Sequence, residues 1–188
     1  AVAGAQNGFE ELAEIQPFIA QMVEEHQYDR VQLERLFRQA RLQQGVLQAM
    51  ARPSTARPWH EFRAATITAA RLREGVDYWR RHAPALGRAA DTYGVPEEII
   101  VATIGIETVY GRAPGKGRVF DALATLAFAY PPRAALFRNE LVELLLLSRE
   151  MRTDPLHYRG SFAGALGVPQ FLPSSYRRHA VDFDGNGR

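Results

Sequence analysis

Three observations predict that this protein is all-α. Apolar residues recur at helical spacing along almost the whole chain, and the alternating pattern of half-buried strands is missing. Prolines and glycines fall between the periodic segments, where helices end. With 188 residues, 46% of them hydrophobic and 23% charged, the chain can bury a core, which excludes a disordered or collagen-like polypeptide.

The N-terminal helical region is placed at residues 9–92. Asp29 is a suitable N-cap for its second helix, because a carboxylate there accepts from a free backbone N–H. Residues 51–58 contain two prolines and small polar residues, which predict a loop, and Pro84 predicts a kink or a short break. Helices are expected over residues 9–26, from about residue 31, and over residues 68–92.

The clearest boundary in the chain lies at residues 94–96. Gly94 suits a helix C-cap, and Pro96 suits the first turn of the next helix, with Glu97 and Glu98 favourable beside its positive end. We therefore begin a second region there, at residues 93–180. Its later helices are expected over residues 119–130, 133–150 and 174–181.

Composition excludes several classes of function. The 23 Lys and Arg nearly balance the 21 Asp and Glu, so the net charge of +2 does not indicate nucleic-acid binding. The absence of cysteine excludes disulfides, a thiolate nucleophile and a cysteine-containing zinc site, and the five histidines lack metal-ligand spacing. No apolar stretch approaches a membrane span. The small, polar residues 1–8 are typical of a mature start, a linker or an expression remnant, and any signal or lipid anchor has been removed or was never there.

Glu107 is the first candidate for chemistry. It follows residues 99–106, which contain no ionisable group, and helical spacing places it on an apolar face near the negative end of the helix. Both surroundings favour the protonated carboxyl, as glycosidic cleavage requires of a general acid. The alternative is a structural carboxylate paired with Arg112 or Arg118.

A second candidate segment runs from Gly160 to Tyr176. Small residues at 160, 163, 164 and 167 allow close backbone approach, while Ser161, Gln170 and Tyr176 offer donors and acceptors suited to sugar hydroxyls and N-acetyl groups. The alternative is a tight connector between helices, which explains the glycines but not the polar residues.

Residues 182–188 match the first seven positions of an EF-hand calcium loop. The candidate ligands are Asp182, Asp184, Asn186 and the backbone at Arg188. The alternative is an ordinary Asp/Asn/Gly turn. Because the sequence ends before the ninth and twelfth positions, we expect this fragment to bind calcium weakly or not at all.

Four motifs resemble the lytic murein transglycosylase B family, which has membrane-bound and soluble members. They are Glu107-Thr108-x-Tyr110-Gly111, residues 121–131, residues 160–175 and residues 182–187. The resemblance covers about residues 59–188. It implies a lysozyme-like helical core over residues 93–180, preceded by the N-terminal helical region and followed by the start of a calcium loop at residues 181–188.

The resemblance also implies the chemistry. Glu107 would be the lone catalytic acid and base in cleavage between N-acetylmuramic acid and N-acetylglucosamine, leaving 1,6-anhydro ends. Ser161 and Gln170 would bind the flanking sugars, and Tyr130 and Arg133 would contact substrate. Pro132 departs from the family, in which this position is often arginine, so binding through that loop rests on weaker ground.

The remaining expectations follow from the same resemblance. The partner would be peptidoglycan glycan strands and not nucleic acid, with other cell-wall enzymes left open. No cofactor is expected for catalysis, and a structural calcium ion is expected in the full-length protein. The location would be the bacterial periplasm, with a lipid anchor to the outer membrane as one option.

Two other functions stay open. A goose-type lysozyme-like hydrolase would use the same glutamate but add water to the glycosidic bond. A non-catalytic cell-wall-binding fragment would hold glycan without cutting it.

Overall fold

The computed structural model describes residue 9 and residues 13–51 and 58–185. Helices make up most of this part of the chain, and its two strands have two residues each, which confirms the all-α prediction. Internal contacts divide the protein into two units. The first unit comprises residues 1–51, 116–166 and 171–188, and the second comprises residues 52–115 and 167–170.

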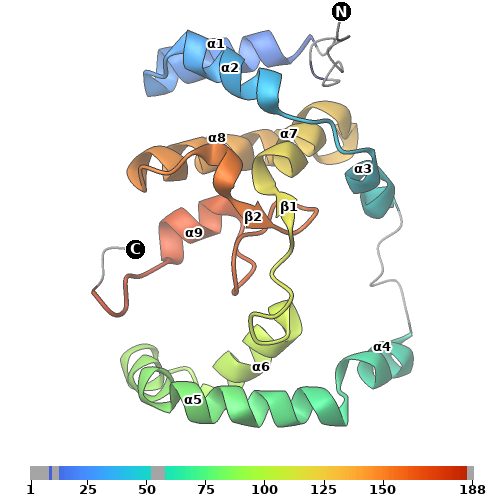
Figure 1. The fold of residues 1–188 in the computed structure, drawn as a ribbon, viewed down its shortest axis with the longest axis vertical. Helices are drawn as coiled ribbons and strands as arrows, with labels where there is room; N and C mark the ends of the chain where they lie inside the picture. Colours follow the sequence, from blue (N-terminus) through green and yellow to red (C-terminus); the bar gives the residue numbers. More distant parts are fainter. Residues whose placement is uncertain (1–8, 10–12, 52–57, 186–188) are drawn as a thin grey trace, which may run out of the picture. The chain divides into compact units, whose positions relative to one another are not determined.

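Figure 1 labels the elements of both units. Those of the first unit are α1 (Ile15–His26), α2 (Arg30–Gln39), α3 (Gln44–Ala51), β1 (Gly117–Arg118), α7 (Val119–Ala129), η1 (Pro131–Arg133), α8 (Ala134–Glu150), η2 (Pro155–His157), β2 (Arg159–Gly160) and α9 (Pro173–His179). Those of the second unit are α4 (Trp59–Thr66), α5 (Ala69–Tyr93) and α6 (Glu97–Thr108). The strands pair antiparallel, with Gly117 opposite Gly160, and are too short to show an alternating pattern in the sequence.

The core of the first unit surrounds α7. Every residue from Val119 to Ala127 is buried, as expected of a helix in which only Asp121 and Thr125 are polar. α7 packs against α8, and Figure 1 shows α1 and α2 on the opposite side of this pair from α9. Edge-to-face rings join the layers, because Phe37 lies 5.4 Å from Phe120 and Phe18 lies 5.5 Å from Phe128 between ring centroids.

A buried carboxylate ties the segment between α2 and α3 to α7. Asp121 is 2% exposed and accepts from Arg118 Nε at 2.8 Å and from the Arg41 backbone N–H at 3.2 Å. One turn further on, Thr125 Oγ1 accepts from the Gln43 backbone N–H at 2.9 Å. Residues 41–43 lie between two helices, so the backbone N–H groups of Arg41 and Gln43 have no acceptor within a helix. Asp121 and Thr125 supply the acceptors that water would otherwise provide.

A second buried carboxylate fastens α9 to α8. Glu140 accepts from the backbone N–H of Ser174 at 2.9 Å and from its hydroxyl at 2.6 Å. Arg177, also on α9, donates to Glu143 and Glu150 on α8. The hydrogen bonds from Arg177 lower the pKa of Glu150.

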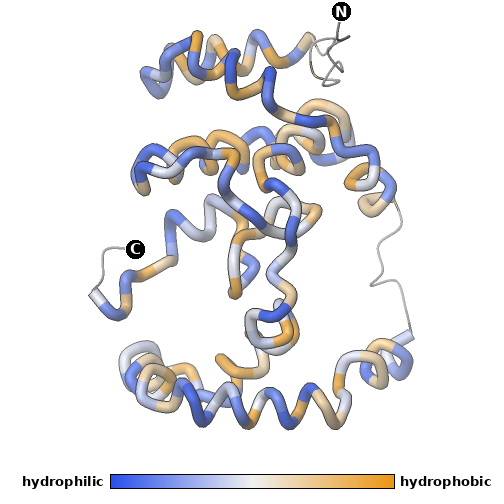
Figure 2. The backbone as a smooth tube through the Cα atoms, in the orientation of Figure 1, coloured by the Kyte–Doolittle hydropathy of each residue, from blue (hydrophilic) through white to orange (hydrophobic). Residues whose placement is uncertain are grey.

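The second unit is built on α5, which Figure 2 colours as alternating hydrophilic and hydrophobic stretches. Thr68 caps its start by accepting from Arg71 N, and Gly94 ends it in the left-handed conformation at φ +69°, as predicted. The helix continues through Pro84, so of the predicted kink or short break, the break is absent from this described segment. α5 and α6 pack against each other on either side of the boundary predicted at residues 92/93. The domain ranges 9–92, 93–180 and 181–188, which were expected from the sequence, stay predictions.

Other local predictions have mixed outcomes. Asp29 caps α2, accepting from Gln32 N at 2.7 Å, as predicted. The predicted helix start at Phe9 is wrong: α1 begins at Ile15 after a turn, and Phe9 is buried in the core. α3 was not predicted. Residues 52–57 of the predicted loop lie outside the described residues, and no helix in the described part of the chain is long and apolar enough to cross a membrane.

Candidate active site

Glu107 lies in the last turn of α6, in the second unit. The predicted apolar surroundings are wrong, because its side chain is exposed. The reason is the orientation of the helix: the buried face of α6 consists of Val101, Gly105 and Thr108, and Glu107 lies beside that face.

The structural alternative for Glu107 is also wrong. Arg112 pairs with Glu74 of α5, and Arg118 pairs with Asp121 of α7 at 2.8 Å. Among the described residues, no hydrogen bond or ion pair engages the Glu107 carboxylate. An exposed carboxylate without a structural partner is free to meet a ligand.

A strained turn follows Glu107 directly. Val109, Tyr110 and Gly111 have φ values of +51°, +59° and +83°, so three consecutive residues are left-handed. A β-branched residue in this region is an outlier, and such strain gathers at functional sites. The turn begins two residues after the candidate acid.

Thr108 holds this turn against the loop at residues 167–170. Its side chain is buried; the hydroxyl accepts from Gly111 N at 2.9 Å and donates to the Val168 carbonyl at 3.0 Å. The structure thus links the end of α6 to the loop that carries Gln170. Thr108 was noticed in the sequence only as part of a motif, since its spacing gives no sign of a contact 60 residues away.

Gln170, the predicted sugar ligand, is half-buried at φ +54°. Its amide Nε2 donates to the carbonyls of Pro114 at 3.0 Å and Gly167 at 2.8 Å. Because both amide hydrogens serve the protein, Gln170 would bind a sugar through Oε1, as an acceptor.

Tyr110 fills a slot between α5 and α6. A Cβ built on Gly105 of α6 would stand 2.6 Å from Tyr110 Oη, and one built on Gly75 of α5 would stand closer still. The ring lies 5.5 Å from Tyr78 between centroids, and burial raises the pKa of both phenols. Two glycines therefore make room for the ring that anchors the turn after Glu107.

Gly105→Ala tests this packing. Alanine normally stabilises a helix interior relative to glycine by about 0.5–1 kcal/mol, but here the added methyl meets the Tyr110 ring. We expect a loss of about 1–3 kcal/mol in the free energy of unfolding, as for other overpacked sites, measured by urea denaturation.

Gly87→Ala is the matched control, in the interior of α5. Its added Cβ would meet only Glu97 Oε1 at 3.5 Å, so the ordinary gain in stability is expected. Placing Gly105→Ala in a Tyr110→Ala background should recover stability. An unchanged or raised stability for Gly105→Ala alone would contradict the packing argument.

The other predicted sugar-binding residues belong to the first unit. Ser161 Oγ accepts from the backbone N–H of Ala163 at 3.3 Å and of Ala165 at 3.0 Å, so it organises its own loop. Its hydroxyl hydrogen is the group it would offer to a sugar. The alternative interpretation of this segment as a tight connector explains the nearby Gly164, since a Cβ there would clash with Leu123 of α7.

Tyr130 and Arg133 flank the proline turn of the first unit. Tyr130 is half-buried against the core, and its carbonyl accepts from Arg133 N at 3.3 Å. The exposed Arg133 guanidinium lies over the Phe137 ring, 5.5 Å from its centroid.

The predicted calcium ligands fall at the edge of the described chain. Asp182 and Asp184 are exposed and followed by Gly185 at φ +71°, whereas Asn186 and Arg188 lie outside the described residues. No group of three or more His, Cys, Asp or Glu side chains in the described part could hold a metal ion. Two side chains alone do not fit a calcium ion, which takes six to eight oxygen ligands.

Glu140 has a structural role that was not predicted from the sequence. It lies three residues after Phe137 and four before Leu144, within the apolar stripe of α8. A carboxylate at such spacing is a visible signal of a buried polar contact, here to Ser174.

Comparison with known proteins matches this chain along nearly its whole length. The profile of the transglycosylase SLT domain covers residues 10–188. Membrane-bound lytic murein transglycosylase B of Escherichia coli (strain K12) is 46% identical over 182 residues, which is 92% of this chain and 50% of the relative. The chain therefore spans about half the length of that curated relative.

Solved structures of lytic transglycosylases also match this chain over nearly its whole length. Soluble lytic transglycosylase SltB1 of Pseudomonas aeruginosa has a TM-score of 0.89 and 50% identity, over 93% of this chain and 59% of that one. Escherichia coli lytic transglycosylase Slt35 in complex with calcium has a TM-score of 0.91 and 46% identity, over 97% of this chain and 58% of that one.

Proposed function

We propose, from the premise that this chain belongs to the transglycosylase SLT domain family, that it cleaves peptidoglycan as a lytic transglycosylase. The observation that carries the proposal is the family match over residues 10–188, which includes Glu107 and the loop of Gln170. The bond cut would be the β-1,4 bond between N-acetylmuramic acid and N-acetylglucosamine. Because the chain spans half of its relative, the activity is proposed for the protein that contains it.

Glu107 would act first as acid and then as base. The carboxylic acid gives its proton to the glycosidic oxygen as the bond from that oxygen to C1 breaks. The carboxylate then takes the proton of the muramyl C6 hydroxyl as O6 bonds to C1, which closes a 1,6-anhydro ring and returns Glu107 to the acid form. No water is consumed, so the second carboxylate of ordinary glycosidases is not needed.

The exposure of Glu107 leaves its carboxyl open to a glycan strand.

We assign substrate contacts to the donor and acceptor atoms of Gln170 and Ser161 that make no hydrogen bond within the described part of the protein. Gln170 Oε1 would accept from a sugar hydroxyl or an N-acetyl N–H, and the Ser161 hydroxyl would donate. Tyr130 and Arg133 would contact the strand as well. In support, SltB3 of Pseudomonas aeruginosa, 29% identical with a TM-score of 0.83, is known in complex with NAG-anhNAM-pentapeptide.

A calcium ion would belong to the longer protein. Asp182, Asp184, Asn186 and the backbone at Arg188 would supply the first ligands of the loop, and later residues the rest. The calcium complex of Slt35 supports this assignment. The membrane-bound relative supports a place in the cell envelope, for which we propose the periplasm.

Product analysis tests the proposed reaction. Purified peptidoglycan sacculi digested with the protein should yield fragments with 1,6-anhydromuramic ends, which weigh one water less than reducing ends in mass spectrometry. Reducing ends would refute the transglycosylase chemistry and favour a goose-type hydrolase. Binding to sacculi without any new ends, in both this chain and a longer one, would favour a non-catalytic cell-wall module.

A further inference from the structure

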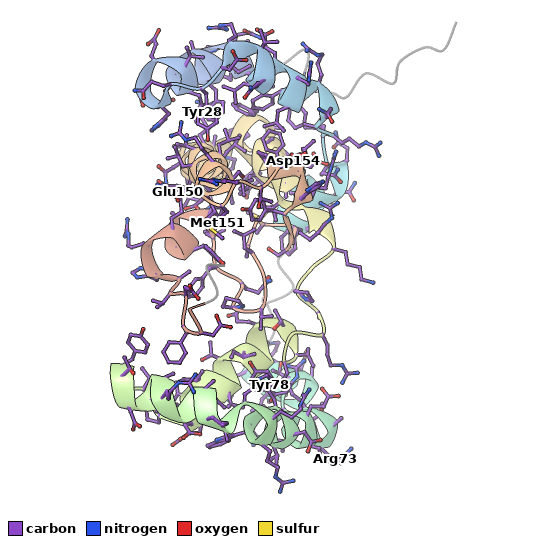
Figure 3. The ribbon with its side chains drawn as sticks, turned by 60° about the vertical axis from the view of Figure 1, so that its left-hand side comes forward. Tyr28, Arg73, Tyr78, Glu150, Met151 and Asp154 are labelled. Carbon is purple, nitrogen blue, oxygen red and sulfur yellow. The ribbon has the colours of Figure 1, made fainter. Side chains whose placement is uncertain are left out.

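A pocket of about 550 Å³ opens in the first unit, between the α1–α2 turn and the C-terminal end of α8. Leu33, Leu36 and Leu145 form its apolar part, and Gln27, Arg149 and Arg152 stand among its polar groups. Figure 3 labels Tyr28 of this pocket, with Glu150 and Met151 at the neighbouring end of α8. The volume is that of a small-molecule site, and the pocket contains none of the residues assigned to the transglycosylase reaction.

Two residues of the pocket are held in the left-handed conformation. Gln27, at φ +55°, ends α1, and Arg152, at φ +50°, follows the end of α8. Glycine is the favoured residue at such helix ends, because a side chain there strains the backbone. The other described non-glycine residues with positive φ are Val109, Tyr110 and Gln170, all at the candidate active site.

Arg149 is positioned by its neighbours. Its Nη1 donates to the His26 carbonyl at 2.7 Å, and its guanidinium lies 4.6 Å from the centroid of the Tyr28 ring. Tyr28 is fixed in turn, because its hydroxyl donates to the Leu145 carbonyl at 2.6 Å. These contacts leave further guanidinium N–H groups of Arg149 for a ligand.

The charge of the pocket is positive. Neither Arg149 nor Arg152 forms an ion pair with any residue that the structure describes. The one acidic lining residue, Asp29, accepts from Gln32 N at the start of α2, so the lining carries two positive charges and one negative charge. A cation near a helix C-terminus is ordinary, which accounts for the charge of Arg149 and Arg152. It does not account for a side chain at the left-handed positions 27 and 152, where glycine would close each helix with less strain.

We propose that this pocket binds a short peptide through its free C-terminal carboxylate. Arg149 and Arg152 would take the carboxylate, since guanidinium groups match its two oxygens. The Gln27 and Gln32 amides would pair with the peptide group, and the leucines would receive an apolar side chain. The site is independent of the proposed reaction, so either assignment can fail without the other.

Titration with N-acetyl-alanyl-leucine tests the proposal, followed by the NMR signals of backbone amides. Saturable shifts should appear in residues 27–36 and 145–155. The same dipeptide with a C-terminal amide should bind at least about tenfold more weakly, because a charge-assisted hydrogen bond contributes about 1.5–3 kcal/mol. Equal binding of the two, shifts confined to other residues, or no saturable shift would overturn it.

Glycine variants separate binding from folding. Gln27→Gly and Arg152→Gly suit the left-handed backbone, so the melting temperature should be kept or raised in both. Dipeptide binding should weaken at least about tenfold in Arg152→Gly, which loses a charged partner, and about twofold to tenfold in Gln27→Gly, which loses a neutral one. Arg178→Gln, an exposed arginine of α9 outside the pocket, is the matched control and should bind as the parent does. Unchanged binding by Arg152→Gly would refute the role of the guanidinium.

Discussion

Glu107→Gln is expected to lower the rate of peptidoglycan cleavage by at least about 10³-fold, because the amide can neither give the proton to the leaving oxygen nor take it from the C6 hydroxyl. The substitution removes no structural hydrogen bond or ion pair found among the described residues, so folding should be unaffected. The rate is measured as release of anhydro-ended fragments from sacculi, with this chain and with a longer one.

Glu98→Gln is the matched control for this experiment. It makes the same chemical change at an exposed position in the first turn of the same helix, and it should leave the rate within about twofold. Cleavage by Glu107→Gln at the parental rate would refute the assignment of Glu107. Equal melting temperatures for all three proteins would show that the loss is chemical.

Asp121→Ala is expected to cost about 2–4 kcal/mol in the free energy of unfolding of the first unit, because the partly buried Arg118 guanidinium loses its ion-pair partner. The backbone N–H of Arg41 loses its acceptor at the same time. The loss should be seen as a lower midpoint in urea denaturation and as faster hydrogen exchange in residues 40–43.

Two controls bracket this result. Asp121→Asn keeps an oxygen for Arg41 N but loses the charge, so an intermediate loss is expected. Asp29→Ala removes a carboxylate of the same size from the exposed N-cap of α2 and should cost only about 1 kcal/mol. An equal loss of unfolding free energy in Asp29→Ala and Asp121→Ala would refute the idea that burial strengthens the contacts of Asp121.

Local features of the fold were predictable because their causes are local. Asp29 caps α2 through a backbone N–H three residues away, and Gly94 ends α5 through its own φ angle. The prolines at 131 and 132 likewise separate α7 from α8. In each case the interacting groups lie within a few residues, so the pattern of letters contains the cause.

Features that depend on distant residues were not predictable. The burial of Glu107 was predicted from the apolar residues before it, but the side of α6 that packs is set by α5. The hydroxyl of Thr108 meets Val168, and the ring of Tyr110 meets Gly75. The sequence of one segment does not reveal which residue of a distant segment will pack against it. The sequence therefore predicts the candidate acid Glu107 but not the residues that hold the turn after it.

The interruption of the first unit has a consequence for how the chain is made. Residues 52–115 are inserted between α3 and the buried helix α7, and the contacts that join the flanks bridge long separations, from Arg41 to Asp121 and from Tyr28 to Leu145. A ribosome therefore releases the aromatic faces of α1 and α2 well before α7 exists to cover them. During that interval Phe18 and Phe37 lack their partners on α7, so we expect the nascent chain to be prone to aggregation until α7 has been made.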